Sequence, residues 1–81
     1  MDLAIAFGKV LRRLRLEARL SQAELALAAG LGRNYVSILE LGRQQPTITV
    51  LLKIASAFNR PASELMELVE SELRTAPKRF R

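Results

Sequence analysis

The 81-residue chain contains no cysteine and no histidine, and each absence removes a class of chemistry. Without cysteine there are neither disulfides nor thiolate metal ligands. Without histidine the chain lacks the commonest general base and the commonest metal ligand. A glycine-rich loop of the kind that cradles phosphates is missing as well. We therefore predict that the chain is not an enzyme and that it holds no metal or other cofactor.

Long apolar runs are also absent, and no stretch approaches the length that spans a membrane. The apolar residues 3–7 are too few for a signal peptide and follow no basic segment. No segment alternates apolar and polar residues with period two, so no strand is expected. The sequence predicts an all-α protein in the cytoplasm, without a membrane partner.

Charge is distributed unevenly along the chain. Residues 1–60 carry nine Lys and Arg against four Asp and Glu, whereas residues 61–74 carry four Glu and one Arg. Residues 75–81 carry three cations and no acid. This pattern predicts one domain over residues 1–74, followed by a basic, disordered tail over 75–81. A basic body favours a polyanionic partner on one face, although charge alone fits a solvated surface equally well.

Four glycines and three prolines divide the chain into five segments with helical periodicity. We expect helices over residues 3–18, 22–30, 33–41, 48–58 and 62–74. Ser21 and Glu24 predict a capping box, and Gly30 predicts a left-handed end to the second helix. Gly42 is expected to be the C-cap of the third helix, and Thr47 the N-cap of the fourth. Most apolar residues of the fourth helix are expected in the core: Ile48, Leu51, Leu52, Ile54, Ala55 and Phe58.

Residues 21–42 are the most informative stretch, because they read as a helix, a tight turn at Gly30 and a second helix. That arrangement is a helix-turn-helix. The second helix presents Arg33, Asn34 and Ser37 from its first turns, at a spacing that faces one wall of a DNA major groove. Arginine can hydrogen-bond guanine O6 and N7 together, and asparagine can hydrogen-bond adenine N6 and N7 together. Ile38 is expected to point outward, where it can contact a thymine methyl group.

An ordered set of residues resembles the lambda-repressor-like, or Cro/repressor-type, helix-turn-helix family over about residues 7–68. The set comprises Leu20-Ser21-Gln22, Glu24-Leu25-Ala26, Ala29-Gly30-Leu31, Tyr35-Val36-Ser37, Leu39-Glu40, Gly42-Arg43, Pro46, Leu51-Leu52-Lys53-Ile54-Ala55, Ala57-Phe58 and Ser63-Glu64-Leu65. The resemblance implies a compact five-helix fold with the helix-turn-helix at helices 2 and 3. It also implies binding to double-stranded DNA as a homodimer on a two-fold operator.

The resemblance carries specific roles onto individual positions. Contacts with DNA bases fall on Arg33, Asn34, Ser37 and Ile38. Contacts with DNA phosphates fall on Gln22, Tyr35 and Arg43. A structural ion pair between Arg15 and Glu40 is implied behind the third helix. Simpler interpretations stay open: Arg33, Asn34 and Gln22 also suit solvated helix starts, and Tyr35 suits half-buried packing.

Three positions depart from the pattern of that family. Arg19 stands where glycine often ends the first helix, which predicts either a positive-φ arginine or a different helix end. Gly32 stands where serine or threonine often caps the third helix, and glycine caps it with a small loss. Leu41 is apolar where polar residues are usual, so a partner chain is a candidate to cover it.

The fifth helix carries more apolar residues than we expect one small core to cover. We predict that Leu65, Val69 and Leu73 contribute to an isologous dimer interface. The alternative is packing on the chain's own first helix, through Leu3 and Ile5.

These patterns favour a sequence-specific transcriptional regulator of the controller-protein or phage-repressor type. Size and the Arg33-Asn34-Tyr35 opening of the third helix favour the controller type. No small-molecule ligand is expected, and RNA polymerase is an open further partner. The alternative function is an antitoxin or adaptor, whose tail over residues 75–81 engages another protein.

Overall fold

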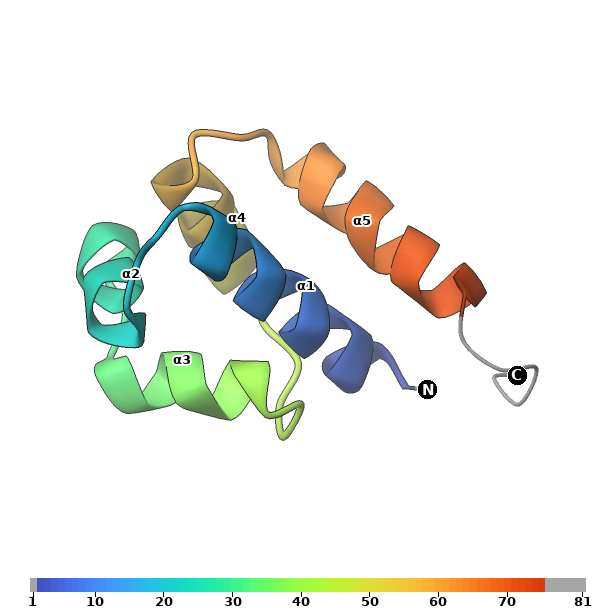
Figure 1. Cartoon of the computed structure of the whole chain (residues 1–81), viewed down its shortest axis with the longest axis horizontal. Coiled ribbons are helices and arrows are strands. Elements are labelled where there is room, and N and C mark those ends of the chain that lie inside the picture. Colours follow the sequence, from blue (N-terminus) through green and yellow to red (C-terminus); the bar gives the residue numbers. More distant parts are fainter. Residues whose placement is uncertain (1, 76–81) are drawn as a thin grey trace.

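The computed structural model describes residues 2–75, which form five α-helices and no strand (Figure 1). The helices are α1 (Leu3–Glu17), α2 (Gln22–Ala29), α3 (Arg33–Glu40), α4 (Ile48–Ala57) and α5 (Ala62–Thr75). The predicted all-α, five-helix fold is therefore confirmed. Because α5 includes Thr75, the first residue of the expected tail is helical, and residues 76–81 lie outside the described residues. Among the helices described here, none is both long and apolar enough to cross a membrane.

Side-chain caps explain where three helices begin. The Asp2 carboxylate accepts a hydrogen bond from the Ile5 backbone N–H at 2.9 Å, which starts α1. At α2 the Ser21 hydroxyl accepts from the Glu24 N–H at 3.0 Å, and the Glu24 carboxylate accepts from the Ser21 N–H at 2.8 Å. At α4 the Thr47 hydroxyl accepts a hydrogen bond from the Val50 N–H at 3.1 Å. Each bond satisfies a backbone donor that has no partner inside the helix. The caps predicted at Ser21 and Thr47 are therefore confirmed, and the cap at Asp2 was not predicted from the sequence.

Turns between helices use the left-handed backbone region. Gly30 has φ 69°, as predicted, and ends α2. Arg19 has φ 60°, so of the two alternatives for the end of α1 the positive-φ arginine is the one observed. The C-cap prediction at Gly42 is one residue late, because Leu41 is the C-cap in a right-handed conformation. Gly42 follows with φ 75° and reverses the chain. Gly32 is the N-cap of α3, without a side-chain hydrogen bond.

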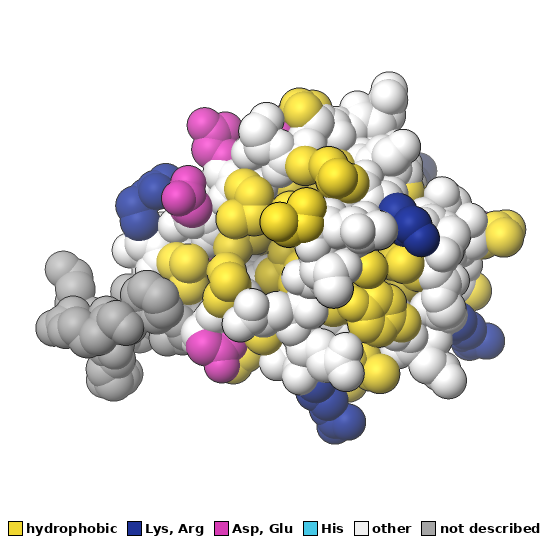
Figure 2. All heavy atoms as spheres, turned by 180° about the vertical axis from the view of Figure 1, so that it is seen from behind, with side chains coloured by type: hydrophobic (Ala, Val, Ile, Leu, Met, Phe, Trp, Pro, Cys, Tyr) yellow, Lys and Arg dark blue, Asp and Glu magenta, His cyan; other side chains and the backbone are white. Residues whose placement is uncertain are grey.

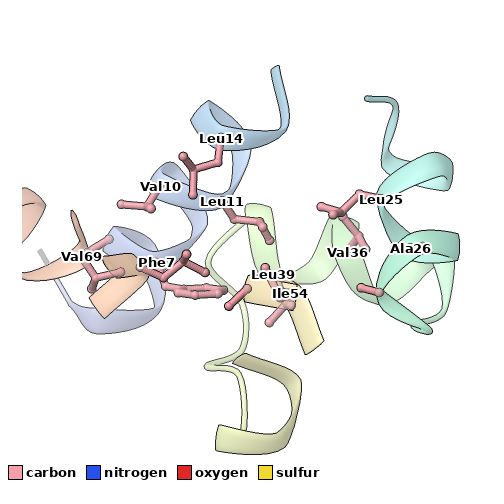
Figure 3. Close-up of a cluster of buried hydrophobic side chains, with 14 residues drawn as sticks. Phe7, Val10, Leu11, Leu14, Leu25, Ala26, Val36, Leu39, Ile54 and Val69 are labelled. Atoms are coloured by element: carbon pink, nitrogen blue, oxygen red, sulfur yellow. The ribbon is translucent and has the colours of Figure 1, made fainter. Parts of the chain in front are cut away.

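A single core receives buried side chains from all five helices (Figure 3). Helix α1 lies at its centre and packs against both α3 and α5, while α2 packs against α3 and α4. Only Ile54 and Ala55 of α4 are fully buried. The expectation that Ile48 and Leu52 are core residues is wrong, since they are 76% and 55% exposed. Both lie on the flank of the buried face at 100° per residue, so α4 leaves an apolar edge uncovered.

Candidate DNA-binding site

Helix α3 is held down by its inner face and is free along its outer face. Val36 and Leu39 are completely buried, so the helix cannot roll without opening the core. In Figure 1, α3 runs along one edge of the molecule, with α2 leading into it through the turn at Gly30. Because side chains three and four residues apart share a helix face, Val36 and Leu39 define the buried face, and Asn34 and Ser37 point away from it. Arg33 lies at the flank of that face, where the first turn leaves it exposed.

The four residues predicted to contact bases differ in exposure. Arg33 and Asn34 are exposed, whereas Ser37 and Ile38 are half-buried. Within residues 2–75, no side-chain hydrogen bond or ion pair engages Arg33, Asn34 or Ser37. Their donors and acceptors are therefore available to an external partner. Arg33 and Asn34 form the most accessible part of the surface, and Ser37 and Ile38 lie one turn further along.

Two predicted phosphate-contacting residues flank this surface. Tyr35 is half-buried, with its ring packed against the core. Arg43 is exposed in the loop that follows α3, and its backbone N–H donates to the Ile38 carbonyl at 3.2 Å. That hydrogen bond fixes the loop backbone to the last turn of α3. Arg33 and Arg43 consequently bring positive charge to the two ends of α3.

Gln22, the third predicted phosphate contact, has an internal partner that the sequence did not reveal. Its side-chain amide donates a hydrogen bond to Oε1 of Glu40 at 3.1 Å. The first residue of α2 is therefore joined to the last residue of α3. The packing of α2 against α3 gives the reason, because it brings the start of α2 close to the end of α3.

The expected ion pair between Arg15 and Glu40 is present and has little exposure to solvent. Nε of Arg15 donates to Oε2 of Glu40 at 2.6 Å, and Nη2 donates to Oε1 at 3.1 Å. Nη1 donates to the Leu20 carbonyl at 2.9 Å. The side chains of Arg15 and Glu40 are 10% and 3% exposed. Bidentate geometry and a third acceptor compensate the desolvation of both charges, so this network fixes α1, the loop before α2 and α3 together.

Hydrogen bonding to Glu40 raises the pKa of Arg15 above its ordinary value, with a smaller contribution from the opposite charge. Burial acts in the other direction and lowers it. The guanidinium therefore stays charged, as arginine does throughout the ordinary pH range. Within residues 2–75, no buried side-chain nitrogen or oxygen lacks a hydrogen-bond partner. Helix α3 thus rests on a fully satisfied polar support.

The predicted dimer interface on α5 needs correction. Leu65 and Val69 are each 1% exposed within the single chain, where they belong to the core against α1. Leu73 is half-buried and packs on the same core. A second chain cannot cover side chains that are already buried, so the assignment of Leu65 and Val69 is wrong. The alternative, packing on the chain's own first helix, holds for these residues, because α1 and α5 close one side of the core.

The model of the family described as helix-turn-helix matches residues 11–65, which include α2, the turn, α3 and α4. The chain belongs to the helix-turn-helix family. A helix-turn-helix transcriptional regulator from Sinorhizobium fredii is 36% identical to this chain over 66 residues, which cover 82% of this chain and 86% of the relative. The chain is accordingly a DNA-binding transcriptional regulator.

Two solved structures are similar in fold as well. The restriction-modification controller protein C.AhdI from Aeromonas hydrophila shares 39% identity and a TM-score of 0.74, covering 76% of this chain and 94% of its own. The controller protein C.Esp1396I, solved as a tetramer with its natural 35 base-pair operator, shares 25% identity and a TM-score of 0.83. That match covers 93% of this chain and 99% of the controller protein.

Proposed function

We propose that this regulator binds a two-fold operator as a homodimer, with α3 of each copy in a major groove. The observation that carries the proposal is the division of α3 into two faces. Val36 and Leu39 are buried, while Arg33 and Asn34 are exposed and have no internal partner in the described part of the chain. In such a complex, two recognition helices enter successive major grooves about 34 Å apart.

Base recognition is assigned to the exposed start of α3. Arg33 suits a bidentate contact with guanine and Asn34 a bidentate contact with adenine. Ser37 and Ile38 follow one turn later and are less exposed. Ser37 offers a hydroxyl to a base edge, and Ile38 offers an apolar surface to a thymine methyl group.

Phosphate contacts are assigned to Gln22, Tyr35 and Arg43. A side-chain amide has two N–H groups, and Gln22 gives one of them to Glu40. The second N–H remains to donate to a phosphate oxygen. In this arrangement the amide is oriented by the protein before DNA arrives, which reduces the entropy lost on binding.

A dimer of this regulator needs an apolar face, and we assign it to the uncovered edge of α4. Ile48 and Leu52 are 76% and 55% exposed, and Leu3 and Met66 are exposed near the same edge. Between them lies an apolar groove of about 140 Å³, which Leu3, Ile48 and Met66 help to line. Figure 2 views the side on which α4 lies and shows hydrophobic side chains gathered across its middle. A second copy is the chosen occupant because a two-fold operator presents the same half-site twice and an isologous contact is self-complementary.

A controller role is the form of regulation that we favour. The 39% identity with C.AhdI, whose chain is matched over 94% of its length, supports it. An antitoxin or adaptor role depends on the tail, most of which lies outside the described residues. Contact with RNA polymerase stays a prediction.

The test of the proposed function is selection of bound sequences from a random duplex pool. We expect a consensus with two-fold symmetry and half-sites one helical turn apart, or a multiple of a turn. A single asymmetric half-site would contradict binding as a dimer. Enrichment of no sequence at all would contradict specific reading.

Replacement of Arg33 by alanine tests the base-contact assignment. The variant should lose about 1–3 kcal/mol of binding free energy on the selected operator and should relax the base preference at one position. Titration of labelled operator and of random duplex measures both effects. Arg43→Ala is the matched control, because loss of a phosphate contact should weaken all sequences alike and reduce the salt slope by about 1. An equal loss on both duplexes for Arg33→Ala would refute its base contact.

A further inference from the structure

Helix α1 approaches the end of α3 so closely that only glycine fits at one of its positions. Gly8 is buried in the middle of α1. A Cβ atom at Gly8 would lie 2.6 Å from the Leu39 carbonyl oxygen and 2.7 Å from the Glu40 carbonyl oxygen. An ordinary carbon–oxygen contact is about 3.3 Å or longer. The atoms in the way belong to the backbone of α3, so no flexible side chain can yield.

The first turn of α1 makes a second close approach, to the turn that follows α3. A Cβ atom at Gly42 would lie 2.9 Å from Cγ1 of Ile5 and 3.0 Å from its Cα. Ile5 thus lies directly against Gly42. Gly8 and Ile5 are three residues apart and share a face of α1, and together they contact the last turn of α3 and the residue after its cap.

We propose that Gly8 and Ile5 are positioning residues that set how α3 is presented to the bases. The inference rests on the proposed function, since it concerns how the same recognition helix is placed. Arg15 and Glu40 also attach the end of α3 to α1, through two long side chains. At Gly8 the backbone of α1 lies against the backbone of α3, and at Ile5 the Cα and Cγ1 atoms lie against Gly42. These contacts define how far α3 lies from α1.

The size of the misfit indicates why this placement affects specificity. To accept a Cβ at Gly8, the end of α3 must move by roughly 0.7 Å relative to α1. Base recognition requires functional groups to be held within about 0.5 Å of their working positions. Contacts with phosphates carry no sequence information, so a displacement that weakens them affects all sequences alike. A shift of α3 should therefore reduce discrimination more than it reduces general affinity.

The test compares Gly8→Ala and Ile5→Ala with the unaltered chain on two duplexes of equal length. One duplex is the operator selected from the random pool, and the other is its scrambled sequence. We measure discrimination as the dissociation constant for scrambled duplex divided by that for the operator. For Gly8→Ala we expect this ratio to fall by about tenfold or more, with affinity for scrambled duplex nearly unchanged. Ile5→Ala removes support without adding bulk, and the ratio should fall by about threefold.

Matched controls separate displacement of α3 from loss of folded protein. Partial unfolding would weaken binding to both duplexes by the same factor, so the ratio would not change. Leu16→Ala shortens another side chain of α1, one that is 52% exposed, and should preserve the ratio. Because Ile5 is 41% exposed, we expect its variant to retain the fold, and it decides the question if Gly8→Ala does not fold.

Each outcome has a defined meaning. A lowered ratio for both variants, or for Ile5→Ala alone where Gly8→Ala is unfolded, supports the inference. If the unaltered chain prefers the operator and the folded variants keep the same ratio, the inference is overturned and the proposed function stands. An unaltered chain that does not discriminate overturns the proposed function, and this inference with it.

Discussion

Replacing Arg15 by methionine should lower the free energy of unfolding by about 3–5 kcal/mol, the range for breaking one partner of a buried ion pair. Methionine keeps much of the apolar stem but removes the donors that reach Glu40 and Leu20. The Glu40 carboxylate, whose side chain is 3% exposed, would then keep only the hydrogen bond from Gln22. Denaturant titration followed by circular dichroism measures the change.

An exposed pair provides the control for this result. Nη1 of Arg13 lies 3.4 Å from Oε1 of Glu72, and the Arg13 side chain is 49% exposed. Arg13→Met should therefore change stability by no more than about 1 kcal/mol. The double variant Arg15→Met/Glu40→Leu should recover part of the loss, because it removes both charges. Similar losses for Arg13→Met and Arg15→Met would contradict the role assigned to burial.

The raised pKa of Arg15 also sets the pH range over which its ion pair with Glu40 contributes to stability. A cation whose folded pKa is raised contributes stability that is present below its unfolded pKa. That contribution is lost only as pH rises through the higher folded value. For arginine both values lie beyond the ordinary alkaline range. The deficit of Arg15→Met should therefore be the same at about pH 7 and about pH 9, and a deficit that disappears over this interval would contradict the assignment.

Introducing a carboxylate on the apolar edge of α4 should have the largest effect on operator binding. Ile48→Glu places a charge at the centre of the proposed contact between two copies. Because Ile48 is 76% exposed, the single chain should stay folded. Loss of the second copy removes the gain from binding two half-sites together, which is typically 10²–10⁴-fold. Sedimentation should shift toward monomer, and operator affinity should fall by a factor in about that range.

Leu16→Glu is the control for charge in this experiment. It introduces the same group at a side chain that is 52% exposed on α1, outside the proposed contact. Any general repulsion from DNA should appear in both variants. A decrease of equal size in both, or an unchanged sedimentation profile for Ile48→Glu, would exclude the α4 edge as the dimer contact.

The sequence predicted the parts of this fold that depend on local chemistry. Ser21, Glu24 and Thr47 form caps with their immediate neighbours, so short-range patterns suffice to place them. Gly30 has the backbone freedom that its turn requires. The outward position of Asn34 also follows from a local pattern, its spacing relative to Val36 and Leu39.

Predictions that depend on packing between distant segments were less accurate. Whether Leu65 meets α1 or a second chain depends on how far α1 covers α5, which periodicity does not specify. Ile48 and Leu52 look like core residues by composition, yet no helix covers their side of α4 within the described chain. The hydrogen bond between Gln22 and Glu40 spans 18 residues and depends on the crossing of α2 and α3.

The lack of internal partners at Arg33, Asn34 and Ser37 has an evolutionary consequence. Substitutions there break no hydrogen bond or ion pair in the described chain, whereas substitutions at Arg15 or Glu40 disrupt the support of α3. In the proposed complex, where these residues contact bases, mutations that change the preferred operator can therefore accumulate with little loss of stability. A lineage of such proteins can diverge in target while retaining one scaffold, which allows related regulators to coexist in a cell without cross-talk.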